Sequence, residues 1–164
     1  MEFVDIHNNK IKVVCAGCAI NSGEYVPPCG LIYKSDHFAV NQDFEIPISG
    51  FMIISCKRHI QSIDQLTDEE QKEFIQIISN IRRGMREELG MEQVALISYE
   101  IPGRIDDHFH LWMYPVTKEA TDKFGTGIKA IKPMMLYAKE NMKTPENIKK
   151  VEEAAEKIKE YMNG

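Results

Sequence analysis

The segment His108–Pro115 (HFHLWMYP) constrains the fold more than any other part of the sequence, because apolar residues alternate in it with histidines and aromatic residues. Alternation with a period of two predicts a β-strand that turns one face toward a core. One face carries His108, His110, Trp112 and Tyr114, and the other carries Phe109, Leu111 and Met113. On such a strand the Cα atoms of His108 and His110 lie about 6.5–7 Å apart, so the two imidazoles are neighbours.

The rest of the chain predicts an α+β domain. Strand-like apolar runs cover 31–34, 38–41, 51–56 and 94–101, whereas the first thirty residues show no regular pattern. Thr67 and Glu70 form a capping box that begins a helix ending near Gly90. A short helix is expected over 134–140. Thr144 and Pro145 begin the last helix, whose apolar stripe packs either on the sheet or on a second subunit. Adjacent hairpins with helices laid against them are typical of α+β proteins.

Composition narrows the function classes. The chain has 164 residues, with 20 Lys plus Arg against 25 Asp plus Glu, which gives a net charge of −5. This length suits a single domain over 1–164. The acidic balance argues against a broad nucleic-acid surface, which needs clustered positive charge. The sequence shows neither a signal-peptide pattern nor an apolar run of about 18 residues, so we expect a cytoplasmic protein without a membrane span.

Four cysteines are too few for a disulfide scaffold, and two of them form a C-x-x-C pair, Cys15 and Cys18. On its own this pair fits half a zinc site, a redox pair or two incidental thiols. A redox pair needs a strand-to-helix junction inside a βαβ unit, and too little chain precedes Cys15 to supply one. A zinc site needs two further ligands elsewhere in the chain.

Two segments in order, Gly50–Glu70 (GFMIISCKRHIQSIDQLTDEE) and HFHLWMYP, resemble the histidine-triad (HIT) family of nucleotide hydrolases and transferases. That family pairs a G-H-x-L-V-I-P-K-x-H segment and an acidic helix start with a later H-φ-H-φ-H-φ-φ-P strand. The resemblance covers roughly Cys15 to Pro115. It implies a five-stranded antiparallel sheet with packed helices, and a homodimer in which two sheets join.

In zinc-bearing bacterial-type members the metal is held by a C-x-x-C, the histidine of the K-x-H segment and the first triad histidine. The resemblance therefore implies Cys15, Cys18, His59 and His108 as ligands of a structural Zn²⁺. Independently of the family, two thiolates and two imidazoles make a closed tetrahedral set that suits zinc. The alternative is that the thiols are free and His59 is a surface residue.

The resemblance also implies a nucleotide site. His110 takes the middle triad position, whose imidazole attacks the α-phosphate and forms a nucleotidyl-histidine intermediate. Asp43 aligns with the residue that accepts hydrogen bonds from the ribose hydroxyls, although a solvated loop aspartate is an equal alternative. Arg104 is a candidate for stabilising charge on the phosphate, and Trp112 for narrowing the phosphate site or stacking on a base.

The sequence departs from the family at several positions. Trp112 replaces the third triad histidine, and indole donates one hydrogen bond but transfers no proton. Phe51 replaces the first histidine of the earlier segment, and Asp106 and Asp107 add negative charge before the triad strand. Two functions therefore stay open. One is a hydrolase or transferase acting on dinucleoside polyphosphates or nucleoside phosphoramidates, and the other is a zinc-stabilised nucleotide-binding module with little turnover.

Overall fold

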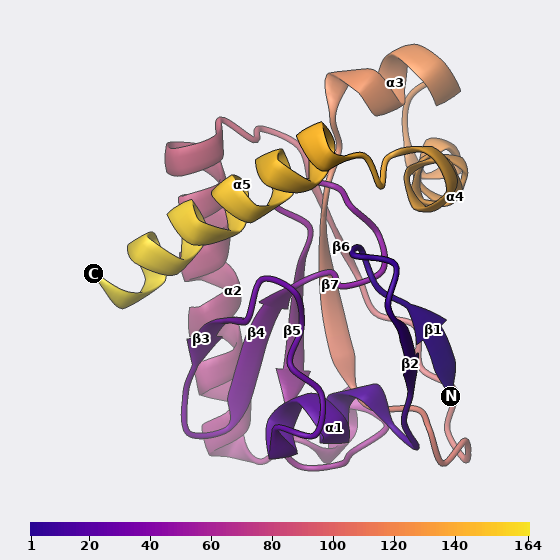
Figure 1. Cartoon of the computed structure of the whole chain (residues 1–164). Helices are drawn as coiled ribbons and strands as arrows, with labels where there is room; N and C mark the ends of the chain where they lie inside the picture. Colours follow the sequence, from indigo (N-terminus) through magenta and orange to yellow (C-terminus); the bar gives the residue numbers. More distant parts are fainter.

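A five-stranded antiparallel sheet forms the centre of the molecule. The structure, a computed structural model, describes residues 1–164. The strands lie in the order β3-β4-β5-β7-β6, and every neighbouring pair is antiparallel (Figure 1). Their bounds are β3 Leu31–Lys34, β4 Phe38–Gln42, β5 Met52–Cys56, β6 Val94–Ile97 and β7 His110–Pro115. The predicted α+β class and the five-stranded sheet are confirmed.

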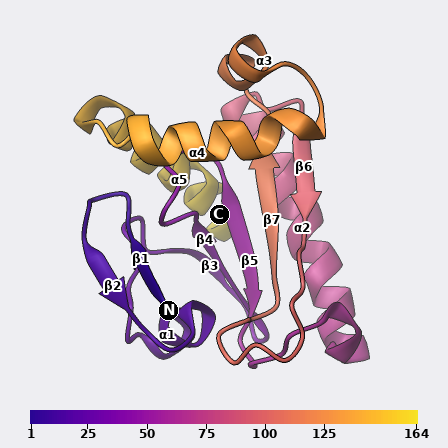
Figure 2. The same cartoon turned by 90° about the vertical axis from the view of Figure 1, so that its right-hand side faces the viewer.

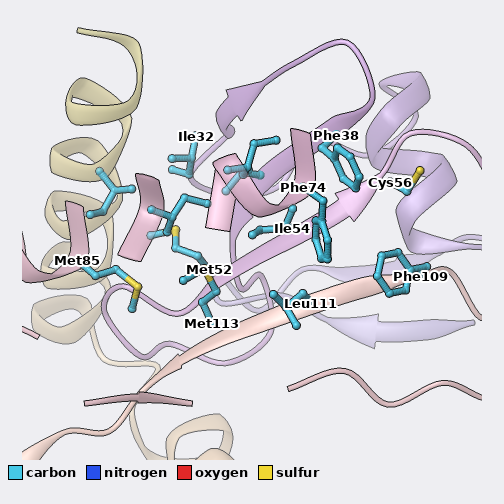
Figure 3. Packing of buried hydrophobic residues seen from close by; sticks show 14 of the residues in the cluster. Ile32, Phe38, Met52, Ile54, Cys56, Phe74, Met85, Phe109, Leu111 and Met113 are labelled. Atoms are coloured by element: carbon cyan, nitrogen blue, oxygen red, sulfur yellow. The ribbon is translucent and has the colours of Figure 1, made fainter. Parts of the chain in front are cut away.

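Helices α2 (Asp68–Leu89) and α5 (Pro145–Asn163) cover one face of the sheet (Figure 1). Alternate strand residues point into this layer and pack on the apolar stripe of α2, as Figure 3 shows for Phe38 and Ile54 beside Phe74. The rings of Phe38 and Phe74 stack with centroids 5.1 Å apart. Because α5 packs on α2 and β3, its apolar stripe is buried within the same chain.

The opposite face is covered in two parts. Helix α4 (Ile131–Asn141) crosses one end of the sheet, with α3 (Lys118–Phe124) beside it (Figure 2). This end is closed by an apolar cluster that includes Phe51, Tyr114 and Met134. Near the other end lie α1 (Ala16–Ser22) and the hairpin of β1 (Glu2–Val4) and β2 (Lys10–Lys12). Short 3₁₀ turns cover Ile63–Gln65 and Ile128–Ala130. No helix has both the length and the apolar character needed to cross a membrane.

The predicted helix ends are confirmed where a local signal specified them. Thr67 Oγ1 accepts the Glu70 N–H, and the Glu70 carboxylate accepts the Thr67 N–H. Gly90 ends α2 with a φ of 64°, a left-handed conformation that glycine adopts without strain. At the start of α5, Thr144 Oγ1 accepts the Asn147 N–H at 3.3 Å, and Pro145 is the first residue of the helix.

Three expectations were wrong in extent. The first thirty residues are not irregular, because they form the β1–β2 hairpin and α1. The strand expected over 94–101 ends at Ile97. The strand expected from His108 begins at His110, because the Phe109 N–H donates to the Ile60 carbonyl rather than within the sheet.

Candidate functional site

Two cysteine and two histidine side chains converge where α1, the segment after β5 and the start of β7 meet. The donor atoms of Cys15, Cys18, His59 and His108 all lie within 4.8 Å of one another. The four distances from a cysteine Sγ to a histidine Nδ1 are 3.6, 3.4, 3.2 and 3.6 Å. Tetrahedral zinc with ordinary bond lengths places sulfur and nitrogen ligands about 3.5 Å apart. The set therefore fits a zinc ion, as predicted, and its four protein donors make a closed, structural site.

Local geometry holds the two cysteines toward the histidines. Cys15 is the N-cap of α1, and its Sγ accepts the Cys18 N–H at 3.4 Å. This N-cap turn therefore brings both sulfurs to one end of the helix. Between them, Gly17 lies against the ring of His108, and a Cβ at position 17 would lie only 2.5 Å from its Cγ. The glycine is thus required for the close approach of α1 to His108.

His108 is oriented by a second contact. Its Nε2 donates to the backbone carbonyl of Cys56 at 2.5 Å, which leaves Nδ1 to face the sulfurs. Metal-bound histidines commonly use their other ring nitrogen in this way, which fixes ring orientation and tautomer. Burial lowers the pKa of His108, so the imidazole is neutral and can donate its lone pair to a metal.

The two thiols are poorly arranged for redox chemistry. Burial and the neighbouring Cys15 raise the pKa of the Cys18 thiol to about 11, whereas reactive thiols have lowered pKa values. The strand before α1 belongs to an antiparallel hairpin and not to a βαβ unit. A dication would instead stabilise both thiolates, because ligand binding requires their deprotonation.

A cavity of about 300 Å³ lies beside the metal cluster, on the sheet face that carries His110. Its floor comes from β4, β5 and β7, and its walls come from α1, the loop after β4 and the loop before β7. The predicted site residues His110, Asp43, Arg104 and Trp112 all line it. The structure therefore brings together, in one cavity, residues that are 69 positions apart in the sequence (112 − 43).

His110 is held in one tautomer. Its Nδ1 lies 2.6 Å from the backbone carbonyl of His108. A carbonyl oxygen only accepts, so Nδ1 carries the proton and Nε2 keeps a free lone pair. Nε2 makes no hydrogen bond within the chain, and the residue lines the cavity. This is the arrangement that a nucleophilic imidazole requires.

Asp43 is buried at the cavity wall. One carboxylate oxygen accepts the N–H groups of Glu45 and Ile46 at 2.9 and 2.8 Å. The other oxygen accepts no hydrogen bond from the protein. Burial raises the pKa of Asp43 to about 7 despite those two bonds. A buried carboxyl group with one unused oxygen is not the solvated loop aspartate of the alternative interpretation.

Arg104 is already paired. Its guanidinium forms a two-bond contact with Asp106, at 3.0 and 2.7 Å. Asp107 accepts the Ile101 N–H at 2.9 Å, and Glu45 pairs with Lys139 at 2.5 Å. With Asp43, the cavity walls thus carry four carboxyl groups against one cationic side chain, that of Arg104. The negative charge expected from Asp106 and Asp107 is present. Arg104 offsets part of it and is therefore not available as an unpaired cation.

Trp112 forms an aromatic wall between the cavity and the apolar cluster under α4. Its ring lies 5.6 Å from the His110 ring and 6.0 Å from the Phe51 ring, centroid to centroid. Phe51 is fully buried and packs edge-on against Tyr114. The two residues that replace family histidines therefore contact each other, and together they make this end of the site apolar.

Sequence reasoning missed Ser55 and Asn41, which also line the cavity. Both are buried, at 4% and 1% exposure. Strand register was the signal that could have found them, because Ser55 lies directly opposite His110 and Asn41 lies in the row of Trp112. That register becomes visible only when β4, β5 and β7 are aligned as neighbours.

Known proteins of similar fold are consistent with this geometry. No family model matches the chain. The protein named Protein hit of Bacillus subtilis (strain 168) is 26% identical over 105 residues, which cover 62% of this chain and 70% of that protein. A zinc-bound histidine triad family protein from Mycobacterium smegmatis superposes with a TM-score of 0.63 at 19% identity, over 91% of this chain and 93% of the other.

A hypothetical histidine triad nucleotide-binding protein from Sulfolobus tokodaii superposes with a TM-score of 0.56 at 18% identity. The match covers 88% of this chain and 94% of that structure. The resemblance expected from two short segments thus extends over nearly the whole chain. The chain has the fold of the histidine-triad proteins, together with a Cys2His2 cluster that fits zinc.

Proposed function

We propose that the chain binds a nucleotide in the cavity and that His110 attacks its α-phosphorus. The observation that carries this proposal is the hydrogen bond from His110 Nδ1 to the His108 carbonyl, because it directs an unprotonated Nε2 at the cavity. The carbonyl also stabilises the positive charge that develops on the ring during attack. The nucleotide-binding protein of the same fold from Sulfolobus tokodaii supports the choice of ligand.

In the first step the lone pair of Nε2 forms a nitrogen–phosphorus bond, and the bond from phosphorus to the leaving group breaks. The bonding electron pair departs with the leaving group. In the second step water attacks phosphorus, the electron pair returns to Nε2, and the water proton passes to solvent. The product is a nucleoside monophosphate, and no atom is oxidised or reduced.

The lack of a proton donor at Trp112 limits the leaving groups that this site can release. An indole N–H donates a hydrogen bond but gives up no proton at neutral pH. A phosphate or nucleotide leaves as a stable anion, whereas an amine needs a proton as it departs. The site therefore favours a phosphoanhydride over a phosphoramidate as the bond that is broken.

The four ligands Cys15, Cys18, His59 and His108 hold a structural zinc ion in this proposal. When bound, the metal cross-links α1, the segment after β5 and the start of β7. It thereby fixes the His108 carbonyl that orients His110. The zinc-bound protein from Mycobacterium smegmatis, which has the same fold, supports this assignment.

A second candidate is a nucleotide-binding module with little turnover. The charge of the cavity favours it, because Asp43, Glu45, Asp106 and Asp107 oppose a polyanionic substrate while Arg104 is bound by Asp106. The missing third histidine favours it as well. The binding site is the same in both candidates, and only the chemical step differs.

Incubation with dinucleoside polyphosphates and adenosine phosphoramidates tests the proposal. We expect a nucleotidyl adduct by intact-protein mass spectrometry at alkaline pH, or release of nucleoside monophosphate, and loss of both in His110→Ala. His7→Ala is the matched control, because His7 pairs with Glu152, does not line the cavity and should leave turnover unchanged. Binding without any product across the panel would favour the module, and an adduct that persists in His110→Ala would exclude His110 as nucleophile.

The single domain over 1–164, the cytoplasmic location, the homodimer and the absence of a nucleic-acid surface remain predictions from the sequence. For the homodimer, the structure offers two sheet edges, β3 and β6. Sedimentation equilibrium of the purified chain tests the oligomeric state directly.

A further inference from the structure

One buried hydroxyl group in the cavity has no hydrogen-bond partner. Ser55 is 4% exposed, and its Oγ makes no hydrogen bond. Two other buried side-chain oxygens, those of Tyr25 and Tyr114, are also unpartnered, but neither residue lines this cavity. Burying a polar group without a hydrogen bond destabilises a protein, so an unpartnered hydroxyl in a cavity calls for an explanation.

Strand register places this hydroxyl beside the proposed nucleophile. Ser55 on β5 and His110 on β7 are directly opposite in an antiparallel pair, so their Cβ atoms lie about 5 Å apart on the same face. On the other side of Ser55 the opposite residue is Ala39, whose side chain has no group that could hydrogen-bond to the Ser55 hydroxyl. A ligand atom in contact with His110 Nε2 is thus within reach of Ser55 Oγ.

The cavity walls offer no free cationic side chain to bind a phosphate, so an uncharged hydrogen-bond donor is needed. The one cationic side chain of the cavity, Arg104, is held by both oxygens of Asp106. The other polar residues on the floor around His110 are uncharged, namely Asn41, Ser55 and Trp112. The Asn41 side-chain N–H group already donates to the Gln42 carbonyl at 2.8 Å. Ser55 is therefore a free donor on the floor, adjacent to His110.

We propose that Ser55 binds the ligand by donating a hydrogen bond to a non-bridging oxygen of the phosphoryl group that His110 faces. The Ser55 hydroxyl makes no hydrogen bond in the free protein and gains one in the complex. This inference rests on the proposed nucleotide function. In the complex, β5 contributes a contact to the phosphoryl group through Ser55. Arg104 makes no such contact, because it remains paired with Asp106 in the loop before β7.

The test combines stability of the free protein with affinity measured by isothermal titration calorimetry. The probes are the four common ribonucleoside 5′-monophosphates and the corresponding nucleosides. In Ser55→Ala we expect monophosphate affinity to fall about 10–100-fold, the range for a hydrogen bond to a charged group. Nucleoside affinity should change by no more than about twofold. The melting temperature without ligand should stay equal or rise, because the substitution removes an unpartnered polar group.

Two variants serve as controls. Ser55→Thr keeps the hydroxyl and suits a strand, so it should retain most of the monophosphate affinity. Ser35→Ala removes a serine whose Oγ exchanges hydrogen bonds with the backbone of Phe38, away from the cavity. It should lower the melting temperature and leave the affinity unchanged, which is the opposite pattern.

The outcomes separate the two proposals. If the wild-type chain binds no monophosphate, the proposed function fails and the Ser55 contact fails with it. If the wild type binds but Ser55→Ala binds equally well, only the Ser55 contact is wrong. Equal losses for monophosphate and nucleoside, or a lower melting temperature with unchanged affinity, would likewise overturn it, because both indicate a structural role.

Discussion

Replacing Gly17 by alanine should destabilise the metal centre, although the same change usually favours a helix. Gly17 lies in α1 between the two cysteines, and a Cβ there would sit 2.5 Å from Cγ and 2.7 Å from Nδ1 of His108. Ordinary carbon–carbon contacts are about 3.5 Å or longer, so helix and ring must separate by about 1 Å. The ring cannot move away without losing a contact, because its Nε2 donates to the Cys56 carbonyl at 2.5 Å.

The expected change in the free energy of unfolding of Gly17→Ala is the sum of two opposing contributions. Alanine is about 0.5–1 kcal/mol more favourable than glycine in a helix, whereas overpacking of this kind costs about 1–3 kcal/mol. We therefore expect a net loss in the free energy of unfolding of about 1 kcal/mol, within a range of roughly 0–2.5 kcal/mol. Metal sites tolerate ligand shifts of only about 0.2 Å, so a displacement of about 1 Å should weaken zinc binding at least as much as a lost supporting contact, about 10–100-fold.

The assay is competition for zinc against a chromogenic chelator, paired with urea unfolding of the zinc-loaded protein. Gly84→Ala is a matched control, because this helical glycine also lies against an aromatic ring, with Tyr161 Cδ1 2.8 Å from the added Cβ. It lies in α2, away from the cluster, and should leave zinc affinity unchanged. A Gly17→Ala protein that binds zinc normally and is about 1 kcal/mol more stable would refute the reasoning, since helix propensity alone predicts that result.

Three further predictions concern the cavity and its surroundings. Trp112→His should raise the rate with a nucleoside phosphoramidate about 100-fold or more, because it supplies a proton donor, and should change the rate with a phosphoanhydride much less. Asp43→Asn should keep the two backbone contacts of that side chain and lose ribose affinity. Burial raises the pKa of Asp43 to about 7, so the contribution of this carboxyl group to stability is lost as pH rises toward and through that value. Thermal melts should therefore show the asparagine variant more stable, relative to the wild type, at pH 8 than at pH 5. Hydrogen bonding to Arg58 lowers the pKa of Glu70 from 4.5 to about 2, so Glu70→Gln should lower the free energy of unfolding by about 1–3 kcal/mol at pH 7. Urea titrations should show the difference in stability between wild type and variant shrinking as pH falls from 4.5 to 2.

Features carried by a few neighbouring residues could be predicted from the sequence. The start of α2 depends on a reciprocal contact between Thr67 and Glu70, three residues apart, and its end depends on Gly90. The start of α5 depends on Thr144 and Pro145 in the same way. The metal ligands could be identified because the resemblance to zinc-bearing histidine-triad proteins implied the four positions, and two thiolates with two imidazoles suit zinc.

The N-terminal elements escaped prediction for a physical reason. Helix α1 spans only seven residues, and its N-cap is a cysteine rather than the serine, threonine or aspartate that usually marks a helix start. The strands β1 and β2 have three residues each, too few to show a period of two. Both elements are defined by tertiary contacts, such as the Ile6 N–H that donates to the Phe44 carbonyl.

The contacts of the cavity residues could be predicted only in part. Arg104 was expected to stabilise charge on a phosphate, but it pairs with Asp106 two residues later. The role of Ser55 depends on its alignment with His110, which is 55 positions away in the chain (110 − 55). The Arg104–Asp106 pair is local to the loop before β7. The position of Ser55 beside His110 has no local signal, because it depends on how β5 and β7 pair in space.

The aromatic wall of the cavity also makes the site directly observable. Trp112 is the only tryptophan in the chain, and its ring is 5.6 Å from the His110 imidazole. Tryptophan emission excited near 295 nm therefore comes from this one position. A bound base, a nucleotidylated His110 or a protonated imidazole would each change the surroundings of that indole. Ligand entry and turnover can thus be followed in unlabelled protein by stopped-flow fluorescence, with Trp112→Phe as the silent reference.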